Sequence, residues 1–115
     1  MRAAGAAQLL GFGRRILGSP ATQRFFSAMD LEWAGNEVAV VESGEPLRID
    51  RLVALEAAQG REWWVLDYKL ATRPHEQAEL GLQLQRYRRA VMLLQPGQVV
   101  RAAFITGQGE VVEVA

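Results

Sequence analysis

The stretch WWVLDYKLA, residues 63 to 71, predicts both the central strand of the fold and the candidate catalytic residues. It is apolar on both faces, which predicts a strand at the centre of a sheet. Asp67 and Lys69 are two residues apart in it, so their side chains lie on the same face. Lys69 is the only lysine of a chain whose other basic side chains are all arginines. We therefore interpret Asp67 and Lys69 as candidate catalytic residues, with a simple ion pair on a solvated edge as the alternative.

The segments around this strand predict a mixed α/β (α+β) fold. Alternating apolar residues predict one strand from Glu37, a second over 46–55 and a third over 62–70. Residues 76–94 predict a helix across one face of the sheet, with an apolar stripe made of Leu80, Leu84, Tyr87, Val91 and Leu94. Residues 99–106 and 110–114 predict a closing hairpin around the turn 107–109.

The N-terminal part predicts a helical arm over residues 1–29. Residues 5–17 have helix-like apolar spacing, and Ser19 followed by Pro20 predicts the N-cap of a second short helix that carries Phe25 and Phe26. The first 29 residues contain four arginines (Arg2, Arg14, Arg15 and Arg24) and no acid, so a transit peptide is an alternative for this segment. We expect one domain over 1–115, with its core over 37–115.

The amino-acid composition excludes several kinds of site and partner. The chain has 115 residues, half of them hydrophobic, and a formal net charge of zero. It has no cysteine, which excludes disulfides, thiolate zinc sites and iron–sulfur clusters and fits a reducing cytoplasm, such as that of a bacterium. No apolar run approaches the roughly 20 residues of a membrane span, so we expect no membrane partner. Arg86, Arg88 and Arg89 form a basic cluster that suits either phosphate or plain solvation.

Asp50 lies in the strand before Asp67. If residues 57–60 form the turn between these strands, Asp50 lies directly opposite Asp67 on the same face. Two carboxylates in an apolar sheet repel each other, and a divalent cation relieves this repulsion. Magnesium binds carboxylates, waters and phosphate oxygens, and it can activate a water. The pattern indicates metal-dependent phosphodiester hydrolysis, in which Lys69 stabilises the charge that develops.

Three motifs, taken in order, resemble a known family. LRID (47–50) ends in Asp50, LDYK (66–69) contains Asp67 and Lys69, and QLQRY (83–87) supplies a Q-x-x-x-Y pair, Gln83 and Tyr87. From about Glu37 to the C-terminus the chain resembles the C-terminal nuclease module of RecB-type and AddA-type helicase–nucleases, in the PD-(D/E)xK superfamily. The resemblance implies a restriction-endonuclease-like mixed central sheet flanked by helices, in the order αα-β-β-β-α-β-β.

The resemblance also implies which residues bind the metal. Asp50, Asp67 and the backbone carbonyl of Tyr68 are expected to hold Mg²⁺ or Mn²⁺, and Glu37 matches a further upstream acid. Lys69 is expected to be catalytic.

Two helix residues are expected to support that site. Gln83 and Tyr87 lie on one helical face and are expected to hold DNA or the lysine, with core packing as the alternative for Tyr87. We interpret His75, the only histidine, as an ordinary loop residue.

The implied partners are DNA and a UvrD/Rep-like helicase domain, in this chain or a partner chain, acting in DNA repair. The chain departs from the family pattern in two places: Leu47 stands where a glycine is usual, and no histidine precedes Glu37. It also has no helicase phosphate-binding loop. An inactive nuclease-like module that binds DNA or docks on a helicase is therefore the alternative function. A small mitochondrial or structural protein with a cleaved N-terminus is a third.

Overall fold

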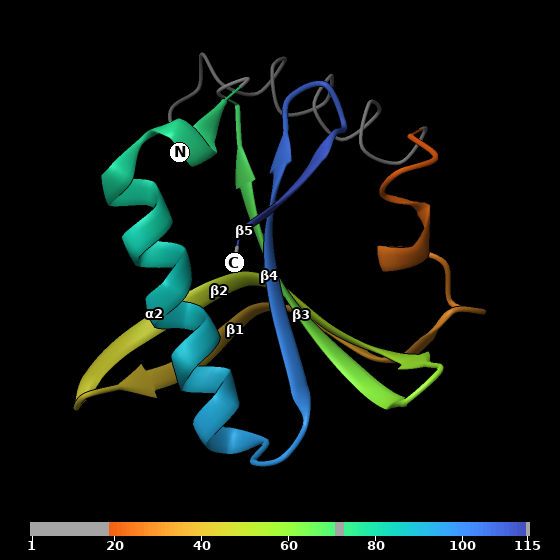
Figure 1. Ribbon diagram of the computed structural model, residues 1–115, viewed down its shortest axis with the longest axis horizontal. Coiled ribbons are helices and arrows are strands. Elements are labelled where there is room, and N and C mark those ends of the chain that lie inside the picture. The colour runs from red at the N-terminus through yellow and green to blue at the C-terminus, as the bar shows by residue number, and fades with distance from the viewer. Residues whose placement is uncertain (1–18, 71–72, 115) are drawn as a thin grey trace.

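The computed structural model describes residues 19–70 and 73–114 of the chain. Five strands form one sheet in the order β1-β2-β3-β4-β5: β1 (Leu31–Glu42), β2 (Glu45–Ala57), β3 (Gly60–Lys69), β4 (Val99–Thr106) and β5 (Val111–Val114). The helix α2 (Ala78–Leu94) lies across a face of this sheet (Figure 1). The mixed α/β class expected from the sequence is thereby confirmed, with β3 at the centre as predicted.

The connections explain why the sheet is mixed. Neighbouring strands pair antiparallel except β3 and β4, which pair parallel. Parallel strands need a long crossover, and α2 supplies it between the end of β3 and the start of β4. A 3-10 turn, η3 (Pro74–Glu76), precedes α2. Pro74 is the first residue of η3, where a proline fits because no backbone N–H is needed there. Consequently α2 begins two residues later than the sequence predicts.

The β2–β3 register is the one that the sequence predicts. Ala57 pairs with Gly60 and Arg51 pairs with Leu66. The loop between the strands is shorter than expected, because Ala57 and Gly60 are themselves strand residues. Gly60 has a φ of +112°, which only glycine adopts easily, so it lets the chain reverse within this short connection.

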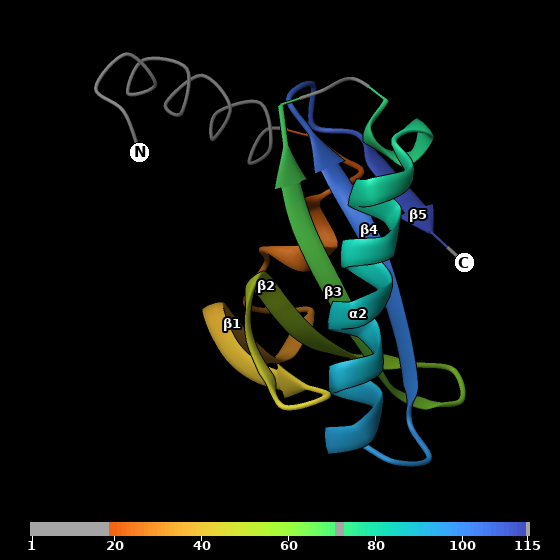
Figure 2. The ribbon, with the colours of Figure 1, turned by 90° about the vertical axis from the view of Figure 1, so that its left-hand side faces the viewer.

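Two apolar clusters cover the two faces of the sheet. On the α2 face, Trp63 and Val65 of β3 pack against Leu84 and Val91 of α2. On the other face, Trp64 and Leu66 pack against Phe25. The ring centroids of Phe25 and Trp64 are 5.0 Å apart. Alternate residues of β3 therefore enter opposite clusters, which is why this strand is apolar throughout. Figure 2 shows α2 on its side of the sheet.

Between Ser19 and β1 the chain is less helical than predicted. In this described part of the arm, a 3-10 turn, η2 (Gln23–Phe25), forms in place of the second helix, and its N-cap is Thr22. The predicted Ser19 N-cap is wrong: the Ser19 hydroxyl donates instead to the Gly109 carbonyl, at 2.6 Å. Tertiary contacts with the β4–β5 turn outweigh the local capping signal. The helix predicted over 5–17 lies outside the described residues.

The start of β1 and the end of the helix stripe also differ from the prediction. β1 begins at Leu31, six residues before the predicted start at Glu37. Leu94, placed on the apolar stripe of the helix, is largely exposed. None of the described helices combines the length and apolar character that crossing a bilayer requires.

Candidate active site at the end of strand β3

The candidate site forms where β2 separates from β3. The ladder between these strands ends at the pair Arg51–Leu66. Beyond it, the backbone N–H of Tyr68 donates to Asp50 Oδ2 at 2.9 Å. A side-chain carboxylate thus replaces the missing strand partner. The separation brings Asp50 to the end of β3 that carries Asp67 and Lys69.

A distortion in β1 accompanies this separation. Glu37 has a φ of +50°, a left-handed conformation that is costly for a residue with a side chain. It lies between the pairs Asn36–Arg51 and Val38–Ile49 and so interrupts the ladder opposite Asp50. Beyond it, the outer half of the β1–β2 hairpin turns aside and passes next to α2 (Figures 1 and 2).

Asp67 is the most constrained of the predicted catalytic residues. It continues the row of Trp63 and Val65 toward α2 and is only 3 % exposed. Its Oδ2 atom lies 3.2 Å from the Lys69 ammonium, whose side chain is about a quarter exposed. This contact is an ion pair without hydrogen-bond geometry, so the buried Oδ2 accepts no hydrogen bond from the described residues. A buried carboxylate oxygen without a donor is uncommon in proteins.

Burial is the main reason why the pKa of Asp67 rises from 3.8 to about 7. The neighbouring Asp50 carboxylate, which hydrogen-bonds the protonated form and repels the charged form, raises this pKa further. Lys69 acts in the opposite direction through its positive charge. The two carboxylates and the ammonium predicted from the sequence are therefore close together and electrostatically coupled.

Tyr87 faces this group from α2. Its side chain is buried in the cluster between α2 and the sheet. Burial raises its pKa, and the negative charges of Asp67 and Asp50 add to the increase. Tyr87 therefore both packs in the core, as the alternative interpretation held, and lies within the field of the carboxylates.

The other helix residue of the motif is placed differently. Gln83 lies one turn before Tyr87 but is exposed, and it makes no hydrogen bond with the part of the chain that the structure describes. It lines a shallow hollow of about 380 Å³ with Glu79, Leu80, Leu82 and Arg86.

Two further residues lie apart from the carboxylates. Glu37 is exposed, and its nearest charged partner is Arg48, at 4.0 Å. Val38 follows Glu37 in the chain, and Ile49 follows Arg48. The side chains of Val38 and Ile49 point toward α2, so the Glu37–Arg48 ion pair lies on the opposite side of the hairpin. The structure therefore does not bring the Glu37 carboxylate to Asp50 and Asp67. His75 is exposed within η3.

Arg86 has a structural role that its place in the basic cluster did not indicate. Its Nε donates to Glu42 at 2.9 Å, and its NH2 lies 3.2 Å from Glu45. These contacts fasten the tip of the β1–β2 hairpin to α2, one residue before Tyr87. Two acids flanking the turn Ser43-Gly44 are the signal that could have identified this contact.

The ligands available for a metal are hard oxygens. Asp50 and Asp67 offer carboxylates, and the Tyr68 carbonyl is the third group expected from the resemblance. Among residues 19–70 and 73–114, no group of three or more His, Cys, Asp or Glu side chains is arranged to hold a metal ion. A cation here would therefore rest on two side chains and complete its shell with waters, backbone and substrate, as Mg²⁺ commonly does. The buried Asp67 Oδ2, which lacks a donor, fits such a ligand.

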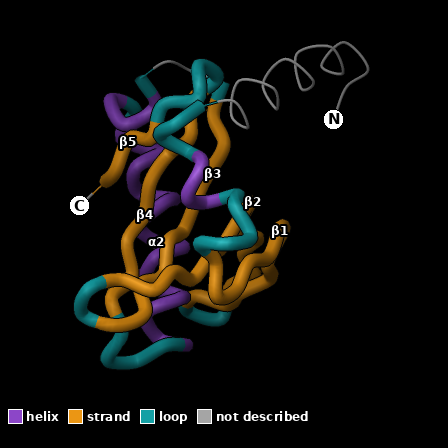
Figure 3. Tube along the Cα trace, turned by 90° about the vertical axis from the view of Figure 1, so that its right-hand side faces the viewer, coloured by secondary structure: helices purple, strands orange, loops and turns teal. Residues whose placement is uncertain are grey.

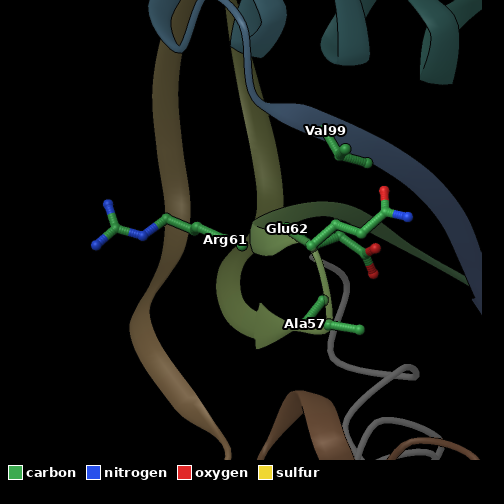
Figure 4. Close-up of a pocket in the computed structure, with 7 residues that line it drawn as sticks. Ala57, Arg61, Glu62 and Val99 are labelled. Atoms are coloured by element: carbon green, nitrogen blue, oxygen red, sulfur yellow. The ribbon is translucent and has the colours of Figure 1, made fainter.

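A separate hollow lies at the opposite end of β3. It has a volume of about 250 Å³ and is lined by Ala57, Ala58, Gln59, Gly60, Arg61, Glu62 and Val99. In Figure 4, Arg61 and Glu62 extend to opposite sides of the hairpin. Asp67 is five residues further along β3, roughly 16 Å away. This hollow is therefore not part of the candidate site.

Comparison with known proteins adds no relative: no protein-family model and no curated protein matches this chain.

Proposed function

We propose that this chain is a metal-dependent deoxyribonuclease domain with a restriction-endonuclease-like fold, of the RecB/AddA type within the PD-(D/E)xK superfamily. The observation that carries the proposal is the Asp67 carboxylate. It is 3 % exposed, and a second carboxylate lies beside it. Its Oδ2 lies 3.2 Å from the ammonium of the only lysine but accepts no hydrogen bond from the described residues. Without a bound metal ion, such an arrangement destabilises the fold. Binding of a metal ion at the two carboxylates would offset this cost.

The roles of the residues follow from their environments. Asp50 and Asp67 would hold Mg²⁺ or Mn²⁺ together with the Tyr68 carbonyl. A divalent cation at such a site lowers the pKa of a water ligand and offsets negative charge on a phosphate. Lys69 is exposed enough to reach substrate and would stabilise the charge that develops during hydrolysis.

Two supporting roles complete the proposal. Tyr87 would orient the carboxylates from α2, and the exposed Gln83 would contact the DNA backbone. In the wider proposal the domain cuts DNA during repair, next to a helicase domain of the same or a partner chain.

Cleavage of end-labelled linear DNA tests the proposal. The purified chain is incubated at pH 8 with Mg²⁺ or Mn²⁺, with and without EDTA. We expect metal-dependent cleavage that Asp50→Ala abolishes and that Arg61→Ala, at the other end of β3, leaves unchanged. Cleavage that persists in EDTA or in Asp50→Ala would refute the assignment.

The second candidate is a nuclease-like module that binds DNA or docks on a helicase without cutting. Among the described residues, no third acidic side chain joins Asp50 and Asp67, and this favours the second candidate. It predicts salt-dependent DNA binding without metal-dependent cleavage.

A further inference from the structure

The outer face of α2 carries large apolar side chains that the fold does not use. Leu82 is 67 % exposed and Leu93 is 75 % exposed, although both belong to a helix whose inner face is fully packed. Arg86 and Arg89 lie between them on the same face. We call Leu82, Arg86, Arg89 and Leu93 the outer stripe. A second apolar stripe on a surface helix indicates a contact surface.

The spacing of the outer stripe is symmetric. Its members follow one another at intervals of four, three and four residues, the spacing of a helix–helix seam. Read from either end, the order is leucine, arginine, arginine, leucine. When two copies of α2 cross antiparallel about a two-fold axis, Leu82 of each lies opposite Leu93 of the other. A self-complementary order of this kind suits an isologous contact.

A hollow lies beside one end of the stripe. Leu82 borders the hollow of about 380 Å³ near Gln83. In the antiparallel arrangement this hollow lies next to Leu93 of the second copy, because Leu82 of one copy lies opposite Leu93 of the other.

The charges are also self-complementary. Arg86 is already paired with Glu42 and Glu45 of its own chain. Arg89 is exposed and lies close enough to Glu42 of its own chain to lower the pKa of that carboxyl, but it makes no ion pair or hydrogen bond with residues of the described ranges. In the antiparallel arrangement it lies opposite the partner's Arg86 position, where Glu45 is exposed and can accept it. Residues 1–29 contain no acid, so they could not neutralise Arg89.

We propose that the outer face of α2 is the contact surface of a homodimer, formed with a second copy of this chain by antiparallel packing of the two helices. Leu82 and Leu93 interdigitate across the axis, and Arg89 pairs with Glu45 of the other copy. The contact is one helix wide and smaller than the roughly 800 Å² per partner of a standard interface, so the dimer is weak and concentration-dependent. This inference is independent of the proposed function, since Tyr87 and the carboxylates lie on the inner side of α2.

Sedimentation equilibrium of the purified chain, from roughly 10 µM to 1 mM, tests the inference. We expect a monomer–dimer equilibrium that Leu93→Asp shifts at least about tenfold toward monomer. Met29→Asp is the matched control, because Met29 is 96 % exposed but lies before β1, and it should dimerise like the wild type. A wild-type chain that stays monomeric at about 1 mM overturns the inference, as does a dimer that Leu93→Asp leaves intact.

A charge exchange identifies the arrangement itself. Arg89→Glu and Glu45→Arg should each weaken self-association, because each places like charges opposite one another. Mixed in equal amounts, the two variants should associate as a heterodimer, in which both contacts again join opposite charges. Failure of the mixture to associate more tightly than either variant alone overturns the antiparallel arrangement.

Discussion

The two ends of β3 surround a carboxylate in opposite ways. At the start of the strand, the Glu62 carboxylate accepts a hydrogen bond of 2.7 Å from the Trp64 indole and lies 3.5 Å from Arg101. At its end, the Asp67 carboxylate has an acidic neighbour, Asp50, and one oxygen that contacts Lys69 but accepts no hydrogen bond from the described residues. The same strand therefore carries a carboxylate that is satisfied by the fold and one that is not.

This difference is what the proposed roles predict for a residue that stabilises the fold and one that binds a ligand. Donors for Glu62 come from within the chain, so its partial burial costs little. The surroundings of Asp67 include a competing acid where a donor would stabilise it, and Lys69 compensates only in part. Strain of this kind persists where a ligand or a reaction requires it.

The largest expected effect is on cleavage. Asp67→Ala should reduce metal-dependent DNA cleavage by about 10³-fold or more, because it removes one of the two proposed carboxylate ligands of the metal. Glu62→Ala, the matched change at the other end of the strand, should leave cleavage within about threefold of the wild type. Initial rates on end-labelled DNA measure both. Equal losses in the two variants would show that the two ends of β3 do not differ in function.

Lys69 comes next. Lys69→Ala should lower the cleavage rate about 10²-fold while metal binding persists, since the ammonium stabilises charge but is not a ligand. Lys69→Arg should restore little, because the broad guanidinium cannot replace a compact ammonium in this position. Single-turnover rates with saturating Mn²⁺ separate the two steps. A fully active Lys69→Ala variant would exclude a catalytic lysine.

Stability should depend on pH through Asp67. Its pKa is about 7 in the fold and near 3.8 when unfolded, so between these values the folded state retains a proton that the unfolded state loses. The free energy of unfolding therefore falls as pH rises from about 4 to 7. Asp67→Asn removes this penalty and should stabilise the metal-free chain by about 2 kcal/mol at pH 8 but not at pH 4. Urea unfolding at the two pH values provides the check; destabilisation at pH 8 would mean that ionised Asp67 is well accommodated.

The smallest effect is expected at Glu62. Glu62→Ala leaves the Trp64 indole N–H without its acceptor and should destabilise the fold by about 1 kcal/mol. The loss should be similar at pH 6 and pH 8 by urea unfolding, unlike the change at Asp67. A stabilised Glu62→Ala variant would contradict the contrast between the two carboxylates.

Much of the fold could be predicted because its signals are local. The apolar run of β3, the stripe of α2 and the turn at 57–60 each fix an element or a register, and they place Asp50 and Asp67 together. The bend at Glu37 could not be predicted, because it depends on where the β1–β2 hairpin meets α2. The contact of Arg86 with Glu42 likewise joins residues far apart in sequence, and the Ser19 contact overrides a local capping rule.

The same distinction applies to the site. Strand periodicity predicted that Asp67 and Lys69 share a face, and the structure agrees. Periodicity assumes regular strands. It therefore could not predict the left-handed conformation of Glu37, whose carboxylate lies beside Arg48 and away from Asp50 and Asp67. Nor could it show that the ladder ends at Arg51 and leaves the Tyr68 N–H to Asp50.

The most direct test is a calorimetric titration of Mn²⁺ into the metal-free chain at pH 8, comparing the wild type with Asp67→Asn. Binding of Mn²⁺ by the wild type and its loss in Asp67→Asn would support a carboxylate pair that is buried to hold a cation. Binding that is absent from the wild type, or unchanged in Asp67→Asn, would contradict this account.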